Sequence, residues 1–319
     1  MLLDVKRLSV SCNGRDESSS LLHDITFGLR EGEVLGIIGE SGSGKTTLVR
    51  GLTNLFPASR RMRSEGAVLF DGRDLLSVDE HVMSSIRRTS IRYIFQEPAS
   101  SFNPLMRIQT QFTLAQSSDD NFSDRSPYES IVATLTQMGL TSPAEVLRSY
   151  PHQLSVGTLQ RVLIAMATIE KPRLLIADEP TSAVDASQRY QILDLLQDQC
   201  RTHGMALLLT THDLSIVRTY ADQIIVLYAG RIVEVSRKDD FFSTPLHPYS
   251  SMLLESISSS SNSLDQVHIT PEKSSGAKDR SKGCKFSSRC PRVHDDCKIV
   301  EPELLFLDEE RKVRCPYWK

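Results

Sequence analysis

The sequence predicts an α/β protein built on a parallel sheet with helices on both faces. Short apolar runs recur along the chain, most of them followed by polar or glycine-bearing loops, and amphipathic stretches such as RVLIAMATI lie between them. Continuous runs of this length are typical of strands buried on both faces, and their alternation with amphipathic segments is typical of a sheet covered by helices. The expected strands are VLGIIG from Val34, IRYIFQ from Ile91, LLIADE from Leu174, ALLLTTH from Ala206 and IIVLYAG from Ile224.

Three departures from this alternation indicate further parts of the chain. GAVLFDG, near Gly66, predicts a short hairpin strand. From about 97 to 166 the pattern changes to Pro, Ser and residues at helical spacing, which predicts a helical subdomain inserted between two core strands. A polar, serine-rich stretch predicts a flexible linker at 258–283, before a cysteine-rich extension at 284–319.

The composition is that of a globular protein and excludes several functional classes. The 319 residues are 39% hydrophobic and 24% charged, with 37 basic against 40 acidic side chains. A net charge of -3 supplies no basic field, so no nucleic-acid partner is expected. No apolar run approaches the roughly 18 residues of a membrane helix, and Asp4 interrupts any signal peptide, so we expect a cytosolic chain whose membrane role is peripheral.

A glycine-rich segment after the first apolar run predicts a nucleotide-phosphate site. Residues 39–46 spell G-x-x-x-x-G-K-T between VLGIIG and a helix start. The glycines let backbone N–H groups point at phosphate oxygens near a helix N-terminus, while Lys45 can reach the β- and γ-phosphates and the Thr46 hydroxyl can ligate Mg²⁺. The candidate nucleotide-binding residues are Gly39, Glu40, Ser41, Gly42, Ser43, Gly44, Lys45, Thr46 and Thr47.

Two adjacent acids close the LLIADE run. Asp178 and Glu179 follow four apolar residues and precede Pro180, which favours a functional strand end over a solvated turn. Asp178 is placed to hold the Mg²⁺ shell, and Glu179 is placed to orient or deprotonate an attacking water.

The order of the motifs resembles the nucleotide-binding subunit of an ABC transporter. GESGSGKT, FQEP, PHQLSVGTLQR, LLIADEPTSAVD and TTHD follow one another in that family's order across roughly residues 1 to 257. The resemblance implies an ATP hydrolase with the P-loop NTPase fold: a RecA-like core, an antiparallel β subdomain and an inserted helical subdomain.

The resemblance also implies a role for each motif residue. Glu179 would be the general base and His212 the γ-phosphate contact. Gln96 would sense Mg²⁺ and water and link to the membrane subunit, and Asp185 would cross the interface of an ATPase dimer. Ser155 and Gly157 belong to the signature loop, which in this family touches the ATP held by the other subunit.

Two positions depart from the family pattern. Val156 stands where the signature loop usually has glycine, and a β-branched residue resists positive φ and a close phosphate approach. Cys12 stands where the family usually offers an aromatic ring to adenine, and its loss removes a stacking contact. A homodimer would carry both defects twice, so we expect a heterodimer with a second ABC ATPase.

Further stretches resemble the oligopeptide and dipeptide permease ATPases. They are IFQEPASSFNPLMRI, YAGRIVEV, PLHPYSSMLL and CKFSSRCPRVHDDC. The resemblance implies a peptide importer whose ATPase lies at the cytoplasmic face of the cell membrane. It would bind two transmembrane permease subunits and depend indirectly on an extracytoplasmic peptide-binding protein.

Four cysteines in the tail form a candidate metal site. Cys284, Cys290, Cys297 and Cys315 have the spacing C-x5-C-x6-C-x17-C, and four thiolates suit zinc or an iron–sulfur cluster. The close cysteine pair usual at zinc sites is missing, and the resemblance implies a four-iron four-sulfur cluster. Zinc and no metal remain the alternatives.

Three other functions remain open on the sequence. A related importer of nickel or another small solute fits, because the cargo is chosen by other subunits. A soluble ABC ATPase acting on ribosomes or DNA is disfavoured, since the chain has one cassette and no coiled-coil insertion. A regulatory subunit with little turnover is suggested by Val156 and Cys12, but Glu179 and His212 argue against it.

Overall fold

The computed structural model describes residues 1–13, 18–57, 61–116, 126–258 and 282–319. Within these ranges the chain forms two compact units. Unit 1 comprises Met1–Leu29, Val34–Ser77 and Leu209–Lys319, and unit 2 comprises Arg30–Glu33 and Val78–Leu208. Nearly all of the expected linker at 258–283 lies outside the described residues.

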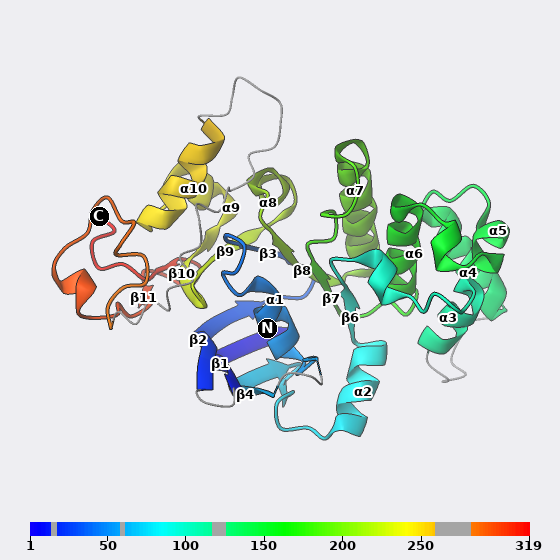
Figure 1. The fold of residues 1–319 in the computed structure, drawn as a ribbon, viewed down its shortest axis with the longest axis horizontal. Helices are drawn as coiled ribbons and strands as arrows, with labels where there is room; N and C mark the ends of the chain where they lie inside the picture. The colour runs from blue at the N-terminus through cyan, green and yellow to red at the C-terminus, as the bar shows by residue number, and fades with distance from the viewer. Residues whose placement is uncertain (14–17, 58–60, 117–125, 259–281) are drawn as a thin grey trace. The chain divides into compact units, whose positions relative to one another are not determined.

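Unit 1 contains a four-stranded antiparallel sheet, drawn in blue and cyan in Figure 1. Alternate residues of its longest inner strand, among them Leu3 and Val5, are fully buried, which is the period-2 pattern of a sheet with one buried face. The hairpin expected near Gly66 is confirmed, because the chain turns at Asp71 and Gly72, both at positive φ. The strands in order are β2 (Ser18–Leu29), β1 (Leu3–Asn13), β4 (Met62–Phe70) and β5 (Arg73–Asp74).

The second group of strands in unit 1 is mixed rather than purely parallel. The expected strands β3 (Val34–Ile38) and β9 (Gln223–Tyr228) are parallel neighbours, as predicted. The chain then turns tightly at Ala229 and Gly230 into β10, which runs antiparallel to β9, because a two-residue turn cannot make a parallel crossover. The remaining strands follow outward from β9 as β10 (Arg231–Arg237), β12 (Lys312–Val313) and β11 (Leu305–Phe306).

The C-terminal segment, residues 282–319, is part of the core of unit 1. Phe286 is 1% exposed and packs in one cluster with Ile224, Phe241, Tyr249 and Leu253. The segment also supplies β12 to the edge of β10. The helices of unit 1 are α1 (Lys45–Leu52), α8 (Leu214–Tyr220), α9 (Lys238–Ser243), α10 (Pro248–Ser258) and the 3₁₀ turn η3 (Asp296–Lys298).

Unit 2 combines a parallel strand pair with a group of helices. Strand β6 (Ile91–Ile94) pairs in parallel with β7 (Leu174–Asp178), as the two apolar runs predicted. Between them in the chain lie α3 (Ile108–Ala115), α4 (Pro127–Gln137), α5 (Pro143–Arg148) and α6 (Val156–Thr168), with the 3₁₀ turns η1 (Pro98–Ser101) and η2 (Pro151–Gln153). These helices gather together in Figure 1 and fall where the helical insertion was expected.

The helix ends of unit 2 follow local capping chemistry. Ser126 and Glu129 form a reciprocal capping box at the start of α4, and the Asp79 carboxylate accepts from the Val82 N–H at the start of α2 (Glu80–Thr89). Unit 2 also contains α7 (Ala186–His203) and the first part of β8 (Ala206–Thr211). The rest of β8, from Leu209, belongs to unit 1. In the described part of the chain, none of the helices has both the length and the apolar character that crossing a membrane requires.

Candidate functional site

The predicted phosphate loop, residues 39–46, connects β3 to α1 in unit 1. Gly44 is the N-cap of α1 and lies at φ 108°, in the region that favours glycine. A Cβ on Gly39 would meet the Leu227 carbonyl oxygen at 2.2 Å, so a larger residue cannot fit there. The loop therefore has the compact backbone that presents N–H groups toward an anion at the start of a helix.

Two polar side chains inside the loop are buried. Lys45 is only 6% exposed, and its ammonium group donates to the carbonyl oxygens of Gly39 at 2.8 Å and Glu40 at 3.2 Å. Ser43 is 5% exposed, and its hydroxyl has no hydrogen-bond partner within the described residues. A buried cation and an unsatisfied buried hydroxyl in one tight loop fit the binding of a polyphosphate with Mg²⁺.

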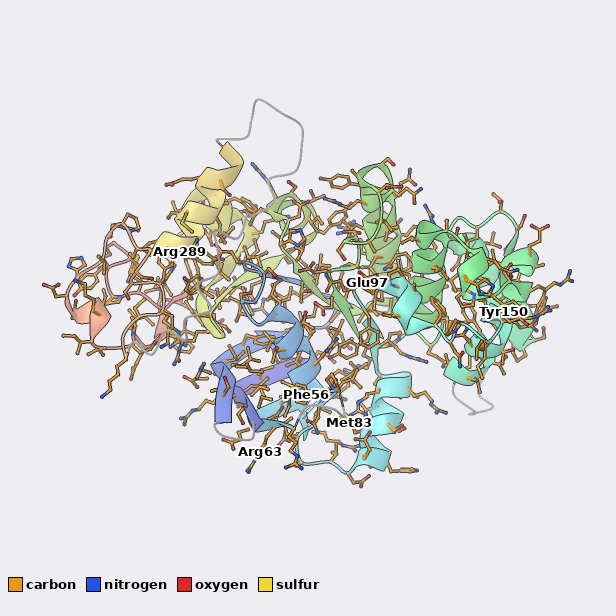
Figure 2. The ribbon with its side chains drawn as sticks, viewed as in Figure 1. Phe56, Arg63, Met83, Glu97, Tyr150 and Arg289 are labelled. Atoms are coloured by element: carbon orange, nitrogen blue, oxygen red, sulfur yellow. The ribbon has the colours of Figure 1, made fainter. Side chains whose placement is uncertain are left out.

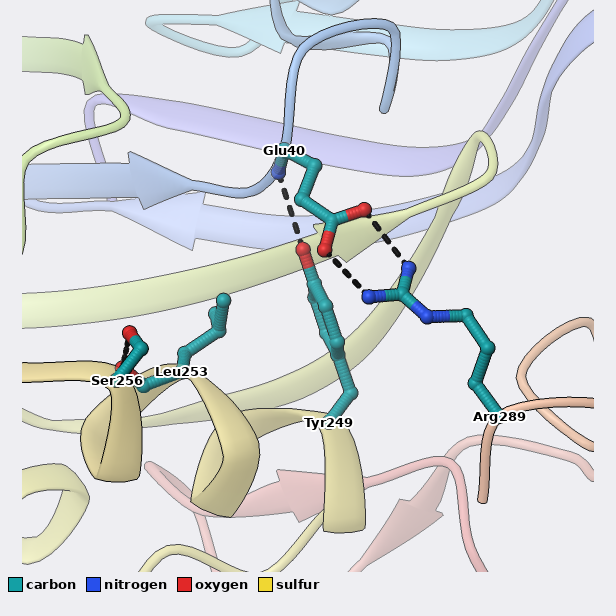
Figure 3. Close-up of polar contacts among 5 residues, drawn as sticks. All are labelled: Glu40, Tyr249, Leu253, Ser256 and Arg289. Atoms are coloured by element: carbon teal, nitrogen blue, oxygen red, sulfur yellow. Dashed lines mark hydrogen bonds and ion pairs between the residues drawn. The ribbon is translucent and has the colours of Figure 1, made fainter. Parts of the chain in front are cut away.

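Three residues that the sequence did not single out hold this loop in unit 1. The Gly230 N–H donates to the Ser43 carbonyl oxygen at 2.9 Å, and the Glu40 N–H donates to the Tyr249 hydroxyl at 3.0 Å. Arg289 forms an ion pair with the Glu40 carboxylate (Figure 3). Gly230 and Tyr249 lie in the quoted YAGRIVEV and PLHPYSSMLL stretches, but their contacts with the loop had no local sequence signal.

His212 follows β8 in unit 1 and is half-buried. The residues on both sides of it are fixed, since the Thr211 hydroxyl accepts from the Asp213 N–H at 3.0 Å. The Asp213 carboxylate in turn accepts from the Ser215 N–H at 2.9 Å and caps α8. His212 is thus presented on a short, rigid turn at the end of a buried strand.

The two predicted acids lie at the end of β7 in unit 2. Asp178 is the last residue of the strand and is 3% exposed. Glu179 follows at φ 47°, an uncommon conformation for a residue with a side chain, and its carbonyl oxygen accepts from both the N–H and the hydroxyl of Ser182. Such local strain is typical of functional turns.

Gln96 and Glu179 are brought together by the parallel pairing of β6 and β7. The Gln96 amide donates to a Glu179 carboxylate oxygen at 3.3 Å, although the two residues are 83 positions apart. The amide therefore orients the carboxylate expected to act as the base.

The signature segment begins α6. The Ser155 hydroxyl accepts from the Thr158 N–H at 3.2 Å and caps the helix. Val156 is the first helical residue and is 44% exposed, with no positive φ. The helix start places residue 156 at an ordinary φ, so the resistance of a β-branched residue to positive φ has no consequence for the backbone at this position. What Val156 adds is an exposed apolar side chain. Gly157 faces α7, where an added Cβ would meet the Gln188 side-chain oxygen at 2.2 Å.

Two neighbouring features complete this part of unit 2. Asp185 is exposed at the N-cap of α7, yet its carboxylate makes no capping hydrogen bond. Just before the signature segment lies Tyr150, which Figure 2 labels among the helices of unit 2. Its ring stacks on His152 with 5.7 Å between centroids, and the Arg107 guanidinium lies 5.5 Å from the same ring. These contacts hold the residues that lead into Ser155.

Cys12 lies in β1, half-buried. Its register partners on the neighbouring strands are Ser19 and Met62, and neither is aromatic. The structure therefore supplies no stacking ring from these two positions.

The four tail cysteines line one pocket in unit 1, here called the cysteine pocket. Cys284, Cys290, Cys297 and Cys315 face it together with His247 and Phe286. Burial raises the pKa of the Cys284 thiol to about 11 and also raises the pKa of Cys315. Throughout the described ranges, no three His, Cys, Asp or Glu side chains are arranged as they stand to hold a metal ion.

Comparison with known proteins agrees with this architecture. Residues 22–182 match the family described as ABC transporter, and residues 233–297 match the oligopeptide/dipeptide transporter C-terminal region. The oligopeptide transport ATP-binding protein AppD of Bacillus subtilis (strain 168) is 35% identical over 98% of this chain and 96% of its own length. The dipeptide transport ATP-binding protein DppD of Escherichia coli (strain K12) is 36% identical over 99% of this chain and 96% of its own length.

A solved structure shares the core. It is the dimeric post-hydrolysis state of an ATP-binding cassette bound to ADP and Pi, with a TM-score of 0.65 and 26% identity over 74% of this chain and 98% of that one. The expected P-loop fold is thereby confirmed. The chain belongs to the ABC transporter family and is one of its ATPases.

Proposed function

We propose that this chain is the ATP-hydrolysing subunit of an importer that takes up oligopeptides or dipeptides. The observation that carries the proposal is the near full-length similarity to ATP-binding proteins named for oligopeptide and dipeptide transport. The match of residues 233–297 to the C-terminal region of such transporters supports the same cargo class. The phosphate loop and the Gln96–Glu179 contact supply the chemistry.

In this proposal the chain's own residues bind ATP and activate water. The phosphate loop cradles the β- and γ-phosphates, with Lys45 as their cation. Thr46 and Asp178, with Gln96, would hold Mg²⁺, which neutralises phosphate charge when bound. Glu179 accepts a proton as water attacks the γ-phosphorus, the bond to the ADP oxygen breaks, and ADP and phosphate are released. His212 contacts the γ-phosphate and reports its presence.

A second ABC ATPase completes the functional unit. The capped Ser155, the adjacent Gly157 and the exposed Asp185 carboxylate are directed to the partner's nucleotide and interface. Exposed Val156 limits the approach of that nucleotide, so the site completed by this loop is the slower one, and a heterodimer is favoured over a homodimer. Closure on ATP and reopening after hydrolysis would drive the cycle.

The membrane partners follow from the same assignment. Two transmembrane permease subunits bind the chain at the cytoplasmic face of the cell membrane, as a peripheral complex. A peptide-binding protein outside the membrane delivers the cargo to the permeases. Movement passes through the Gln96 loop and the helical subdomain, residues 97–166, to the permeases.

The cysteine pocket would hold an iron–sulfur cluster, and a zinc ion is the alternative occupant. Four thiols of the right chemistry face one largely apolar pocket, which fits either group in donor type and number. Such a group would be structural or sensory, since the ATP chemistry lies elsewhere. Anaerobic purification with iron, sulfide and zinc analysis separates the three cases: cluster, zinc or no metal.

Anaerobic affinity purification of the chain from native membranes tests the whole proposal. We expect two multi-spanning permeases, a second ATPase and a peptide-binding protein at stoichiometric levels. Companions from the ribosome or from DNA repair, with no membrane protein, would overturn it. A binding protein for nickel or another small solute would redirect the cargo class.

A further inference from the structure

Glu40, the second residue of the phosphate loop, is held from three directions, and Figure 3 shows its contacts with Tyr249 and Arg289. Its carbonyl oxygen accepts from Lys45 at 3.2 Å, and its N–H donates to the Tyr249 hydroxyl at 3.0 Å. Its carboxylate accepts two hydrogen bonds from Arg289, at 2.8 and 2.9 Å. The phosphate loop is therefore connected to two residues that lie far along the chain: Tyr249 is 209 positions from Glu40, and Arg289 is 249 positions from it.

Arg289 belongs to the C-terminal segment and directly precedes Cys290 of the cysteine pocket. The side chains of Glu40 and Arg289 are 17% and 36% exposed, so water shields the pair only in part. The guanidinium also lies 5.9 Å from the ring centroids of Tyr228 and Phe286. A bidentate pair against two aromatic rings has a defined geometry, which an ordinary surface ion pair lacks.

Tyr249 is a second connection between the cysteine pocket and the phosphate loop. Its fully buried ring contacts Tyr228 and Phe286, with centroids 4.7 and 5.4 Å apart. Its N–H donates to the Nδ1 atom of His247 at 3.1 Å. Because His247 and Phe286 both line the cysteine pocket, one packed cluster contacts the pocket on one side and Glu40 on the other.

The charge of Glu40 gives this arrangement a consequence for nucleotide binding. A carboxylate beside a loop built for a polyphosphate repels that anion unless a cation neutralises it. Arg289 provides the cation and fixes the carboxylate in place, while Tyr249 fixes the backbone of the same residue. Both contacts reduce the reorganisation that the loop requires when ATP binds.

We propose that Arg289 is a positioning residue through which the C-terminal segment sets the affinity of the phosphate loop for ATP. The inference rests on the phosphate-binding role proposed above for residues 39–46. Arg289 acts through Glu40 and takes no part in the hydrolysis step. The affinity for ATP thus depends on how the C-terminal segment is folded around its cysteine pocket.

A double-mutant cycle on the full-length chain tests the proposal. Binding of a fluorescent N-methylanthraniloyl ATP with Mg²⁺ is measured for the wild type, Arg289→Ala, Glu40→Gln and the double variant. Arg289→Ala is expected to raise Kd about fivefold, since an uncompensated charge is left beside the nucleotide. The double variant is expected to bind like Glu40→Gln alone, because without the carboxylate the arginine has nothing to neutralise. In the assembled transporter, KM for ATP rises for Arg289→Ala while kcat stays unchanged.

Matched variants separate positioning from loss of folding. Arg237→Ala also removes an ion pair to the C-terminal segment, to Glu310, but it leaves the Arg289–Glu40 pair in place, so nucleotide affinity should be unchanged. Arg289→Lys keeps the charge without the bidentate geometry and should recover part of the affinity. Tyr249→Phe keeps the buried ring, removes the acceptor of the Glu40 N–H, and should weaken binding in the same direction.

Equal binding by the wild type and Arg289→Ala would overturn the inference. So would strictly additive effects in the cycle, or an equal loss in Arg237→Ala, which would indicate general loosening of the segment. Absence of nucleotide binding by the wild-type chain itself would instead contradict the proposed function. The two failures are therefore distinguishable.

Discussion

The Gln96 amide donates to the Glu179 carboxylate at 3.3 Å, linking a residue just beyond β6 to the residue that follows β7. Glu179 also lies at φ 47°, and its carbonyl oxygen accepts from Ser182, so its backbone and side chain are both constrained. An oriented carboxylate reaches the attacking water with less reorganisation than a free one. Gln96 and Glu179, which the sequence analysis gave separate roles, are therefore in direct contact.

Replacing Glu179 with Gln is expected to trap ATP and to stop turnover at the site that uses this chain's phosphate loop. The amide keeps the size of the side chain but cannot accept the proton, so turnover at this site should fall roughly 100-fold or more. Single-turnover ATP hydrolysis with the assembled partner measures the effect. Glu65→Gln is the matched control, since Glu65 is an exposed carboxylate on β4 with no role in the proposed site, and it should leave turnover unchanged. Normal hydrolysis by Glu179→Gln would remove Glu179 from the role of base.

Replacing Gln96 with Glu is expected to move the acidic limb of the pH profile of ATP hydrolysis to higher pH. Two carboxylates at this separation disfavour each other's charged form, so the apparent pKa of the pair rises and the base stays protonated to higher pH. The acidic limb of the kcat profile should therefore move to more alkaline pH. Gln96→Ala removes the hydrogen bond without adding charge and should leave that limb in place. Equal shifts in both variants would contradict the electrostatic explanation.

Removing the bulk of Val156 is expected to accelerate the site completed by this chain's signature loop. In a Glu179→Gln background with a different second ATPase, the remaining turnover comes from that site alone. Val156→Ala should raise it several-fold, and Val156→Gly should do no better, because residue 156 already has helical φ. Faster turnover in Val156→Gly alone would show that backbone freedom at residue 156 matters. Unchanged turnover in both variants would show that Val156 does not slow the site.

Replacing the buried Glu234 with Gln is expected to flatten the pH dependence of stability. Glu234 is fully buried on β10 and accepts from the N–H groups of Leu246 and His247, while burial raises its pKa and Arg311 opposes that rise. A carboxyl whose folded pKa is raised binds more protons when folded, so its contribution to the unfolding free energy is present at low pH and is lost as pH rises through the folded pKa.

Thermal unfolding from pH 5 to 8 measures this loss. The Tm of the wild type should fall as pH rises, and the Tm of Glu234→Gln should lack this fall. The reason is that the amide retains an acceptor oxygen but carries no charge. Glu65→Gln, at an exposed position, is the control and should follow the wild type. Parallel profiles for wild type and Glu234→Gln would show that this carboxyl does not titrate within the range.

Contiguous patterns were enough to predict the phosphate loop, the strand ends that carry Asp178 and His212, and the helical segment before β7. Each depends on residues that are neighbours in the chain: glycines that allow positive φ, apolar runs that bury a strand, and caps that start a helix. The antiparallel edge beyond β9 was missed, since the apolar pattern of a buried strand is the same in either direction.

By itself, then, the sequence determined the local backbone of the phosphate loop and the chemical identity of the acids, because those are properties of short segments. Only the tertiary structure decided that Arg289 neutralises Glu40, that Tyr249 holds the Glu40 N–H and that His247 lines the same pocket as the four tail cysteines. These contacts exist because Phe286 joins the core of unit 1 and β12 pairs with β10, which brings the C-terminal segment back to the loop. Such packing is set by the sum of many buried surfaces, and no local pattern encodes it.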